Sequence, residues 1–191
     1  MPTMSRTKRA ILDAALELGA RNGISGTTMD DVAERAGVAK GSVYYNFASK
    51  DKLFEELLTS GVASLSAVLH EARVSAGGWA GVEDMVRSML ALIAGNRSLA
   101  KLMAAEIFRT DRAWQQTLFV LRREALTEFV EAIRPLAPAD DGQRLLMASS
   151  IFGATLMGGL EWLLFSPERP LDEVAAAILY PFTGRLAGKT G

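Results

Sequence analysis

Two residue types that carry much of protein chemistry are nearly missing from this sequence. Its 191 residues include no cysteine and one histidine, His70. Without cysteine the chain can form neither a disulfide nor a reactive thiolate, a composition that suits the reducing cytoplasm. One histidine and no cysteine also leave the usual ligand sets of zinc sites incomplete. We therefore expect a cytoplasmic protein with no metal site and no cofactor.

The chain also lacks a large excess of charge of either sign, and it lacks a long apolar run. The chain carries 21 Lys and Arg against 22 Asp and Glu, a net charge of −1. The basic start is followed by Asp13 and Glu17, which interrupt the apolar stretch that a secretory signal requires. The longest uncharged apolar run, Leu145 to Leu160, has 16 residues, fewer than the roughly 20 that span a bilayer. We expect this run to form a buried helix and no membrane span.

Catalytic motifs do not appear either. The sequence has no HExxH zinc motif and no glycine fingerprint that follows a strand. Gly184 to Thr190 reads GRLAGKT, but a phosphate-binding P-loop has four residues, and not three, between its first glycine and the Gly-Lys-Thr. The acidic pair Asp30-Asp31 lies at a predicted helix start, where the helix dipole favours it. We therefore expect no enzymatic activity.

What the sequence does contain is a helical pattern throughout. Apolar residues make up 49% of the chain, which is enough for a substantial core and excludes a disordered protein. They recur at helical spacing, and no strand-like alternation bounded by hairpin turns appears. We predict an all-α fold, with helices over residues 6–21, 29–36, 40–47, 50–74, 81–94, 98–109, 112–133, 142–165 and 171–186.

The most informative stretch is residues 27–50, TTMDDVAERAGVAKGSVYYNFASK. Thr28, followed three residues later by Asp31, predicts a capping box at the start of a short helix. Gly37 ends that helix, because glycine at a C-terminal cap adopts the left-handed conformation without strain. A second short helix follows after a tight turn. This arrangement is typical of a helix-turn-helix, whose second helix enters the major groove of DNA.

The second helix of this pair has an unusual outer face. Val43 and Phe47 form its inward side, and its outward side contains no acidic residue. Small residues allow the backbone to approach a surface closely, while hydroxyl groups and lysine reach phosphates. Asparagine and lysine can also read base edges in a major groove. The outward residues are Lys40, Gly41, Ser42, Tyr44, Tyr45 and Asn46.

A basic cluster precedes this stretch. Arg6, Lys8 and Arg9 lie close together near the N-terminus. The first 52 residues hold eight Lys and Arg against six Asp and Glu, so they carry a net charge of +2 in a chain whose total is −1. The asymmetry is small, but the cluster can supply phosphate contacts beside the second helix.

The stretch resembles the N-terminal domain of the TetR family of bacterial transcriptional regulators. The resemblance covers roughly the first 55 residues and rests on Thr27-Thr28, Val32-Ala33, Arg35-Ala36-Gly37-Val38, Lys40-Gly41, Tyr44-Tyr45-Asn46-Phe47 and Ser49-Lys50-Asp51-Lys52-Leu53. Asn46 departs from the pattern, because the family often has histidine there, and this affects the target sequence more than the function. The DNA contacts that the motif and the resemblance predict are Thr27, Thr28, Lys40, Gly41, Ser42, Tyr44, Tyr45, Asn46 and Lys50.

The resemblance also implies two domains: a helix-turn-helix DNA-binding domain at 1–48, and a helical ligand-binding and dimerisation domain at 49–191. The helix predicted over 50–74 would extend roughly 38 Å at about 1.5 Å per residue. Leu53 and Phe54 are expected to face the first domain. In the mechanism that the resemblance implies, a small molecule in the second domain shifts this helix and changes the separation of the two reading helices in a dimer.

The second half of the chain is rich in methionine and aromatic residues. Such side chains line adaptable apolar pockets, but they also fill ordinary cores, and core packing is the alternative for each of them. The resemblance implies a ligand cavity among the helices after the first three. Glu106 and Arg109 would border such a cavity or be solvated. The candidates for an apolar ligand are Met85, Met89, Met103, Ile107, Trp114, Met147 and Phe152.

Several glycines interrupt the helix predicted over 142–165. A glycine inside a helix costs about 1 kcal/mol relative to alanine, so these positions indicate the close approach of another helix. The resemblance implies that the last two helices form a four-helix bundle across a two-fold dimer, and close packing within one subunit is the alternative. The candidate interface residues are Ser149, Gly153, Gly158 and Trp162.

Together these patterns predict a transcriptional repressor. It would bind a pseudo-palindromic operator as a homodimer and be released by an apolar small-molecule ligand. The alternative class is a helical small-molecule-binding protein, or an enzyme, that does not regulate DNA, and the acid-free face over 40–46 argues against it. An activator, or a structural DNA-binding protein without a ligand, is a third possibility, and the position of the operator decides between repressor and activator.

Overall fold

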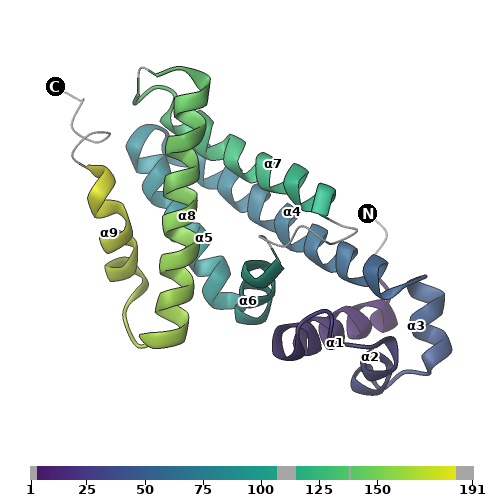
Figure 1. The fold of residues 1–191 in the computed structure, drawn as a ribbon. Coiled ribbons are helices and arrows are strands. Elements are labelled where there is room, and N and C mark those ends of the chain that lie inside the picture. Colours follow the sequence, from purple (N-terminus) through teal and green to yellow (C-terminus); the bar gives the residue numbers. More distant parts are fainter. Residues whose placement is uncertain (1–3, 107–114, 138, 184–191) are drawn as a thin grey trace. The chain divides into compact units, whose positions relative to one another are not determined.

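A computed structural model describes residues 4–106, 115–137 and 139–183 of the chain (Figure 1). All regular secondary structure in these ranges is helical, so the all-α prediction is confirmed. Where a predicted helix end falls within the described ranges, it lies within three residues of the observed one. The helices are α1 (Arg6–Asn22), α2 (Met29–Ala36), α3 (Lys40–Asn46), α4 (Lys50–Ala76), α5 (Gly78–Gly95), α6 (Arg97–Glu106), α7 (Gln115–Ile133), α8 (Asp141–Phe165) and α9 (Leu171–Phe182).

The chain divides into two compact units. The first comprises Met1–Gly61 and Ser98–Phe119, and the second comprises Val62–Arg97 and Val120–Gly191. Helices α4 and α7 therefore contribute residues to both units. The first unit extends beyond the boundary at residue 48 that the sequence predicted, because it also includes the first turns of α4 and almost all of α6.

Local signals in the sequence set the starts of the first two helices. The Ser5 hydroxyl accepts a hydrogen bond from the Lys8 N–H at 3.1 Å and so caps α1. At the start of α2, the Thr28 N–H donates to the Asp31 carboxylate at 2.9 Å, and the Asp31 N–H donates to the Thr28 hydroxyl at 3.1 Å. The predicted capping box is therefore present, and it satisfies donors that a helix start leaves unpaired.

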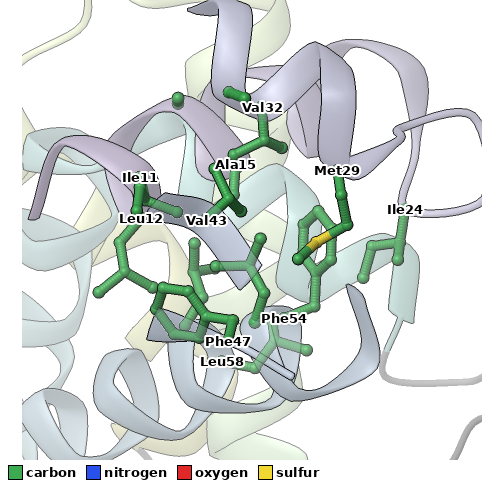
Figure 2. Close-up of a cluster of buried hydrophobic side chains, with 14 of the residues drawn as sticks. Ile11, Leu12, Ala15, Ile24, Met29, Val32, Val43, Phe47, Phe54 and Leu58 are labelled. Carbon is green, nitrogen blue, oxygen red and sulfur yellow. The ribbon is translucent and has the colours of Figure 1, made fainter. Parts of the chain in front are cut away.

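The apolar faces of α1, α2, α3 and the first turns of α4 meet in one core (Figure 2). Val43 of α3 and Phe54 of α4 are 0% exposed. Complete burial of a side chain of this kind contributes about 1.5–3 kcal/mol, so this core fixes the position of α3. The expectation that Leu53 and Phe54 face the first domain is confirmed. The other buried members are Ile11, Leu12, Ala14, Ala15, Ile24, Met29, Val32, Ala33, Phe47, Leu57, Leu58 and Leu102.

Helix α6 packs on this same core. Leu102 is 1% exposed and is a member of the core cluster. A small residue on α1 makes the close fit possible, because a methyl group at Gly19 would lie 2.7 Å from the Phe54 ring and 3.5 Å from Leu102. The periodicity of the sequence predicted α6 as a helix, but it did not predict this position.

In the second unit, α5 packs against α8 and α9, and α8 packs against α9 (Figure 1). A methyl group at Gly159 of α8 would lie 3.0 Å from side chains of Leu90 and Ile93, so this glycine allows α8 to lie close to α5. Phe152 of α8 contacts Phe129 of α7 edge to face, with ring centroids 6.2 Å apart. These contacts form the core of the second unit.

Helix α8 contains the apolar run that the sequence analysis identified. By length and composition alone it could cross a membrane, with a mean hydropathy of 1.3 over its most apolar window, but a core helix passes the same test. One face of α8 is buried within the unit and includes Ala148, Ile151 and Thr155. The expectation of a buried helix is therefore confirmed for this face.

The single histidine of the chain joins α4 to α7 within the second unit. Arg73 Nε donates to the Glu128 carboxylate at 2.7 Å, and His70 Nδ1 lies 3.3 Å from the same carboxylate. Only 18% of the Glu128 side chain is exposed, so this ion pair lies at the edge of the core rather than in open solvent. The cluster ties the later turns of α4 to α7.

Candidate nucleic-acid interface

The turn between α2 and α3 has a geometry that glycine makes possible. Gly37 adopts a left-handed conformation, with φ of 66° and ψ of 33°. Its N–H donates to the Glu34 carbonyl at 3.1 Å, and the Val38 N–H donates to the Ala33 carbonyl at 3.1 Å. This pair of bonds is the Schellman motif, which ends a helix and reverses the chain at once. The motif leaves three residues between the end of α2 and the start of α3, a turn length that suits a helix-turn-helix.

The two sides of α3 differ as the sequence predicted. Val43 is 0% exposed and Phe47 is 3% exposed, and both lie in the core shown in Figure 2. On the other side, Tyr44 is 48% exposed and Tyr45 is 91% exposed. A tyrosine that leaves its ring almost entirely in water gains nothing from burial within its own chain. These two rings are therefore available to a partner outside the chain.

Gly41 lies on the exposed side of α3. Neither a packing contact nor a backbone angle within the described chain requires glycine at this position. A methyl group at this position would meet no atom within 4 Å, and Gly41 has no positive φ. Gly19 of α1 is different, because a methyl group there would lie 2.7 Å from a core side chain. The absence of a side chain at Gly41 leaves the backbone of α3 open to close approach from outside.

A groove lies between the start of α1 and the exposed side of α3. Its volume is about 370 Å³ and it is open to solvent. Hydroxyl groups, an amide and a glycine line it, which are groups that bind phosphate oxygens. Sequence reasoning missed the contribution of Ser5 and Thr7, although Ser5 could have been found as the residue that caps α1 beside the basic cluster. The lining residues are Ser5, Thr7, Gly41, Ser42, Tyr45 and Asn46.

Lys40 begins α3 and forms an ion pair with α2. Its Nζ lies 2.6 Å from Asp30 Oδ2, and both side chains are 60% exposed. The hydrogen bond with Asp30 raises the pKa of Lys40 above its ordinary value, so the side chain is a cation at neutral pH. Exposed ion pairs contribute little to stability, so Lys40 can exchange this carboxylate for a phosphate at little cost.

Three predicted DNA contacts are engaged inside the domain. Thr27 is 0% exposed, and its hydroxyl donates to the Gly23 carbonyl at 2.9 Å, so that hydroxyl does not face solvent. The ammonium group of Lys50 lies within hydrogen-bonding distance of three carbonyls in the loop between α1 and α2. Asn46 is half-buried, and its amide donates to the Ser42 carbonyl at 2.8 Å. Thr28 remains exposed at the start of α2.

One member of the basic cluster is also engaged. Lys8 Nζ lies 2.6 Å from Glu56 Oε1 and 5.3 Å from the centroid of the Phe47 ring. Lys8 thereby links α1 to α4 over the edge of the core, and its side chain is 30% exposed. Arg6 and Arg9 flank it on the exposed side of α1.

This combination of a buried helical core, a glycine-ended turn and an exposed polar second helix is that of a helix-turn-helix domain. Residues 11–57 match the family model described as "Bacterial regulatory proteins, tetR family". Residues 11–57 thus have the N-terminal domain that this family model describes, so the resemblance found in the sequence is confirmed over this part of the chain.

Known relatives agree with this assignment. The chain is 41% identical over 51 residues to the HTH-type transcriptional regulator AcrR of Shigella flexneri, covering 27% of this chain and 24% of the relative. It is 41% identical over 49 residues to IcaR of Staphylococcus aureus, a negative transcriptional regulator of a biofilm operon, covering 26% of each chain. The chain therefore matches only about a quarter of the length of these curated relatives.

A solved structure extends the likeness to the whole fold. The transcriptional regulator FadR from Bacillus subtilis, solved in complex with stearoyl-CoA, matches with a TM-score of 0.77 and 20% identity. The match covers 90% of this chain and 95% of FadR. A helix-turn-helix domain followed by a helical second part is thus confirmed as the architecture of the chain.

The predicted ligand residues are distributed over both units. Met85 and Met89 of α5 and Phe152 of α8 are buried in the second unit, and Met147 of α8 is half-buried. Met103 is partly buried and packs against the core of the first unit. Ile107 and Trp114, like Arg109, lie outside the described residues.

The predicted dimer residues face in different directions. A methyl group at Gly153 would meet no atom within 4 Å, whereas one at Gly158 would lie 2.8 Å from Ile178 of α9 in the same chain. Trp162 is 9% exposed, and its indole N–H donates to the Arg169 carbonyl at 3.0 Å. Ser149 is half-buried. Of the four, Gly153 is the residue whose α-carbon borders open space.

Proposed function

We propose that this protein is a transcriptional repressor that binds an operator in double-stranded DNA with the exposed side of α3. Lys40, Tyr44 and Tyr45 contact the DNA backbone and base edges, and Gly41 lets the backbone of α3 approach the DNA closely. The hydroxyl groups of Thr28 and Ser42 donate hydrogen bonds to phosphates, and Asn46 lies beside Ser42 in the groove next to α1.

The observation that carries this proposal is the contrast between the two sides of α3. A short helix is held by fully buried side chains on one side, while the other side keeps Tyr45 91% exposed beside a glycine that no packing contact requires. A side that served only solubility would carry acids and lysines in any order. The absence of acid from residues 40–46 favours a polyanionic partner.

Selection of bound duplexes from a random DNA pool at fixed salt tests this function. The purified chain should enrich a pseudo-palindrome whose half-site centres lie about 34–36 Å apart, one helical turn, or a multiple of that distance. Recovery of no enriched sequence, with only weak binding that disappears as salt rises, would mean that α3 does not read DNA.

We further propose that two copies of the chain associate through the outward side of α8. Leu146 is 71% exposed, Met157 is 60% exposed and Leu164 is 50% exposed. At 100° per residue these three positions and Gly153 lie within about 20° of one line along the helix. An exposed apolar line of this kind marks an interface, and open space at Gly153 permits close helix–helix approach. A two-fold dimer would present two copies of α3 to two half-sites.

The proposed effector is an apolar small molecule bound in the second unit. Its core is rich in buried methionine and aromatic side chains, and FadR shows that this fold can hold a ligand with a long acyl chain. The effector releases DNA only if it binds the DNA-free conformation more tightly than the DNA-bound one. Titration of acyl-CoA thioesters of increasing chain length into the operator complex tests the class, and release that does not depend on chain length would contradict it.

A further inference from the structure

The first residue of α4 holds the loop between α1 and α2. Lys50 Nζ lies 2.9 Å from the Thr27 carbonyl oxygen, 3.0 Å from that of Ile24 and 3.4 Å from that of Ser25. An ammonium group has three N–H donors, and each of them has a carbonyl oxygen within reach here. The cation of Lys50 is therefore directed into the domain.

Lys50 supplies charged donors to a loop that lies outside the helices. The chain leaves α1 at Gly23, whose φ is 73°. Within the loop, the Thr27 N–H donates to the Ile24 carbonyl at 3.3 Å. Ile24 is 1% exposed and Thr27 is 0% exposed, so their side chains anchor the loop in the core while Lys50 binds its carbonyls.

Thr28 follows this loop directly, and its placement depends on it. The Thr27 carbonyl that Lys50 binds belongs to the peptide group that continues into Thr28, the N-terminal cap of α2. Thr28 is exposed, and in the proposed function its hydroxyl contacts a phosphate. A shift of this peptide group would rotate the Thr28 hydroxyl and the first turn of α2.

We propose that Lys50 is a positioning residue for operator binding, which acts through the α1–α2 loop and Thr28 and does not itself contact a phosphate. This inference rests on the proposed function. It changes the role that the sequence pattern assigned to Lys50, because an ammonium group that turned to a phosphate would leave its loop carbonyls without their charged donor. Since residues 62–76 of α4 belong to the second unit, Lys50 also connects the loop to the helix that both units share.

Lys50→Met removes the ammonium group and keeps the apolar stem, and Lys52→Met is its matched control. Lys52 lies in the same first turn of α4 and loses the same charge, but its Nζ binds Glu55 on the surface at 2.7 Å. We expect Lys50→Met to weaken operator binding about tenfold, while Lys52→Met stays close to the wild type. In the free protein, hydrogen exchange of the amides of residues 24–31 should become faster in Lys50→Met only.

A double-mutant cycle with Thr28→Ala separates positioning from a general loss of stability. If Lys50 acts through Thr28, the double variant binds the operator about as well as Lys50→Met alone, because both substitutions remove the same hydroxyl–phosphate interaction. The slope of log K against log salt should stay at the wild-type value, since Thr28 neutralises no phosphate.

A direct phosphate contact gives the opposite results, and these would overturn the proposal. The effects of Lys50→Met and Thr28→Ala would add, hydrogen exchange of the loop would not change, and the salt slope would become shallower by about 0.9 for each phosphate that Lys50 had neutralised. If the wild-type chain binds no duplex at all, the proposed function fails, whereas the exchange measurement still shows whether Lys50 holds the loop.

Discussion

At the scale of single residues, two glycines of the first unit differ in what surrounds them. Gly19 faces Phe54 and Leu102, so its missing side chain is needed for the core. Gly41 faces open space, so its missing side chain is needed only if something approaches from outside. Gly19 is therefore a structural glycine, and Gly41 is a candidate functional one.

Gly41→Leu tests this interpretation. We expect the variant to fold at least as stably as the wild type, because replacing a helical glycine by a good helix former contributes up to about 1 kcal/mol. Operator affinity should fall about tenfold or more, because the leucine side chain prevents the approach of the α3 backbone. Chemical denaturation and fluorescence anisotropy with a labelled operator measure the two quantities.

Gly95→Leu is the matched control for this experiment. Gly95 ends α5, and a methyl group there also meets no atom within 4 Å. The control should leave operator binding unchanged. Wild-type affinity in Gly41→Leu would show that α3 does not approach DNA closely at this position.

At the same scale, the sequence motif predicted residue types better than their partners. Thr27 and Lys50 match the family pattern, yet the structure engages both in the α1–α2 loop. The sequence shows that a lysine lies near a helix start, but it does not show whether the ammonium group binds a phosphate or a carbonyl. That choice depends on the path of a loop 23 to 26 residues earlier, which no local pattern encodes.

At the scale of elements, the start of α2 depends on the ionisation of one carboxylate. The hydrogen bonds from the Thr28 hydroxyl and backbone N–H lower the pKa of Asp31 below its ordinary value of 3.8. A lowered pKa in the folded state means that the stabilising contribution is present above the unfolded pKa and is lost as pH falls through the folded pKa. The cap should therefore weaken only in acid.

Asp31→Asn should destabilise the protein at pH 6 and have a smaller effect at a pH well below 3.8, where the stabilising contribution of the wild-type carboxylate is being lost. Urea denaturation followed by circular dichroism at both pH values measures the difference. In a Thr28→Ala background the pH dependence should shrink, because the hydroxyl that lowers the pKa is gone. An equal loss of stability at both pH values would contradict this account.

Element boundaries were predictable because their signals are local. Thr28, Asp31 and Gly37 lie within ten residues of one another, and their caps need no tertiary contact. The location of α6 was not predictable, because an apolar stripe that includes Leu102 shows that a face is buried but not which core buries it. The close packing of Gly19 against Leu102 of α6 brings together residues more than 80 positions apart in the sequence.

At the scale of the whole molecule, the proposed repressor needs two reading helices and therefore two chains. The glycine pattern of α8 did not distinguish contacts within the chain from contacts between copies. Gly158 and Gly159 pack against α9 and α5 of the same chain, whereas Gly153 borders open space. This distinction depends on the space around each glycine, which the sequence does not contain.

Met157→Glu tests the proposed interface on α8. A carboxylate in an apolar helix–helix contact would be desolvated without a partner, so we expect the variant to sediment as a monomer. Operator affinity should fall about 100-fold or more, because each half-site is then bound independently. Val74→Glu on α4 is the control, since Val74 is also an exposed apolar residue, at 63% exposure. A Met157→Glu variant that remains dimeric would place the interface elsewhere.

The central claim is that the exposed side of α3 reads DNA, and Tyr45 tests it most directly. The measurement is the equilibrium affinity of Tyr45→Ala and Tyr44→Ala for the operator recovered from the random pool, together with the thermal midpoint of each variant. Because Tyr45 is 91% exposed, its removal should leave the thermal midpoint unchanged while operator affinity falls about tenfold or more. Wild-type affinity in Tyr45→Ala and Tyr44→Ala would contradict the account, because the two exposed tyrosines of α3 would then not touch the DNA.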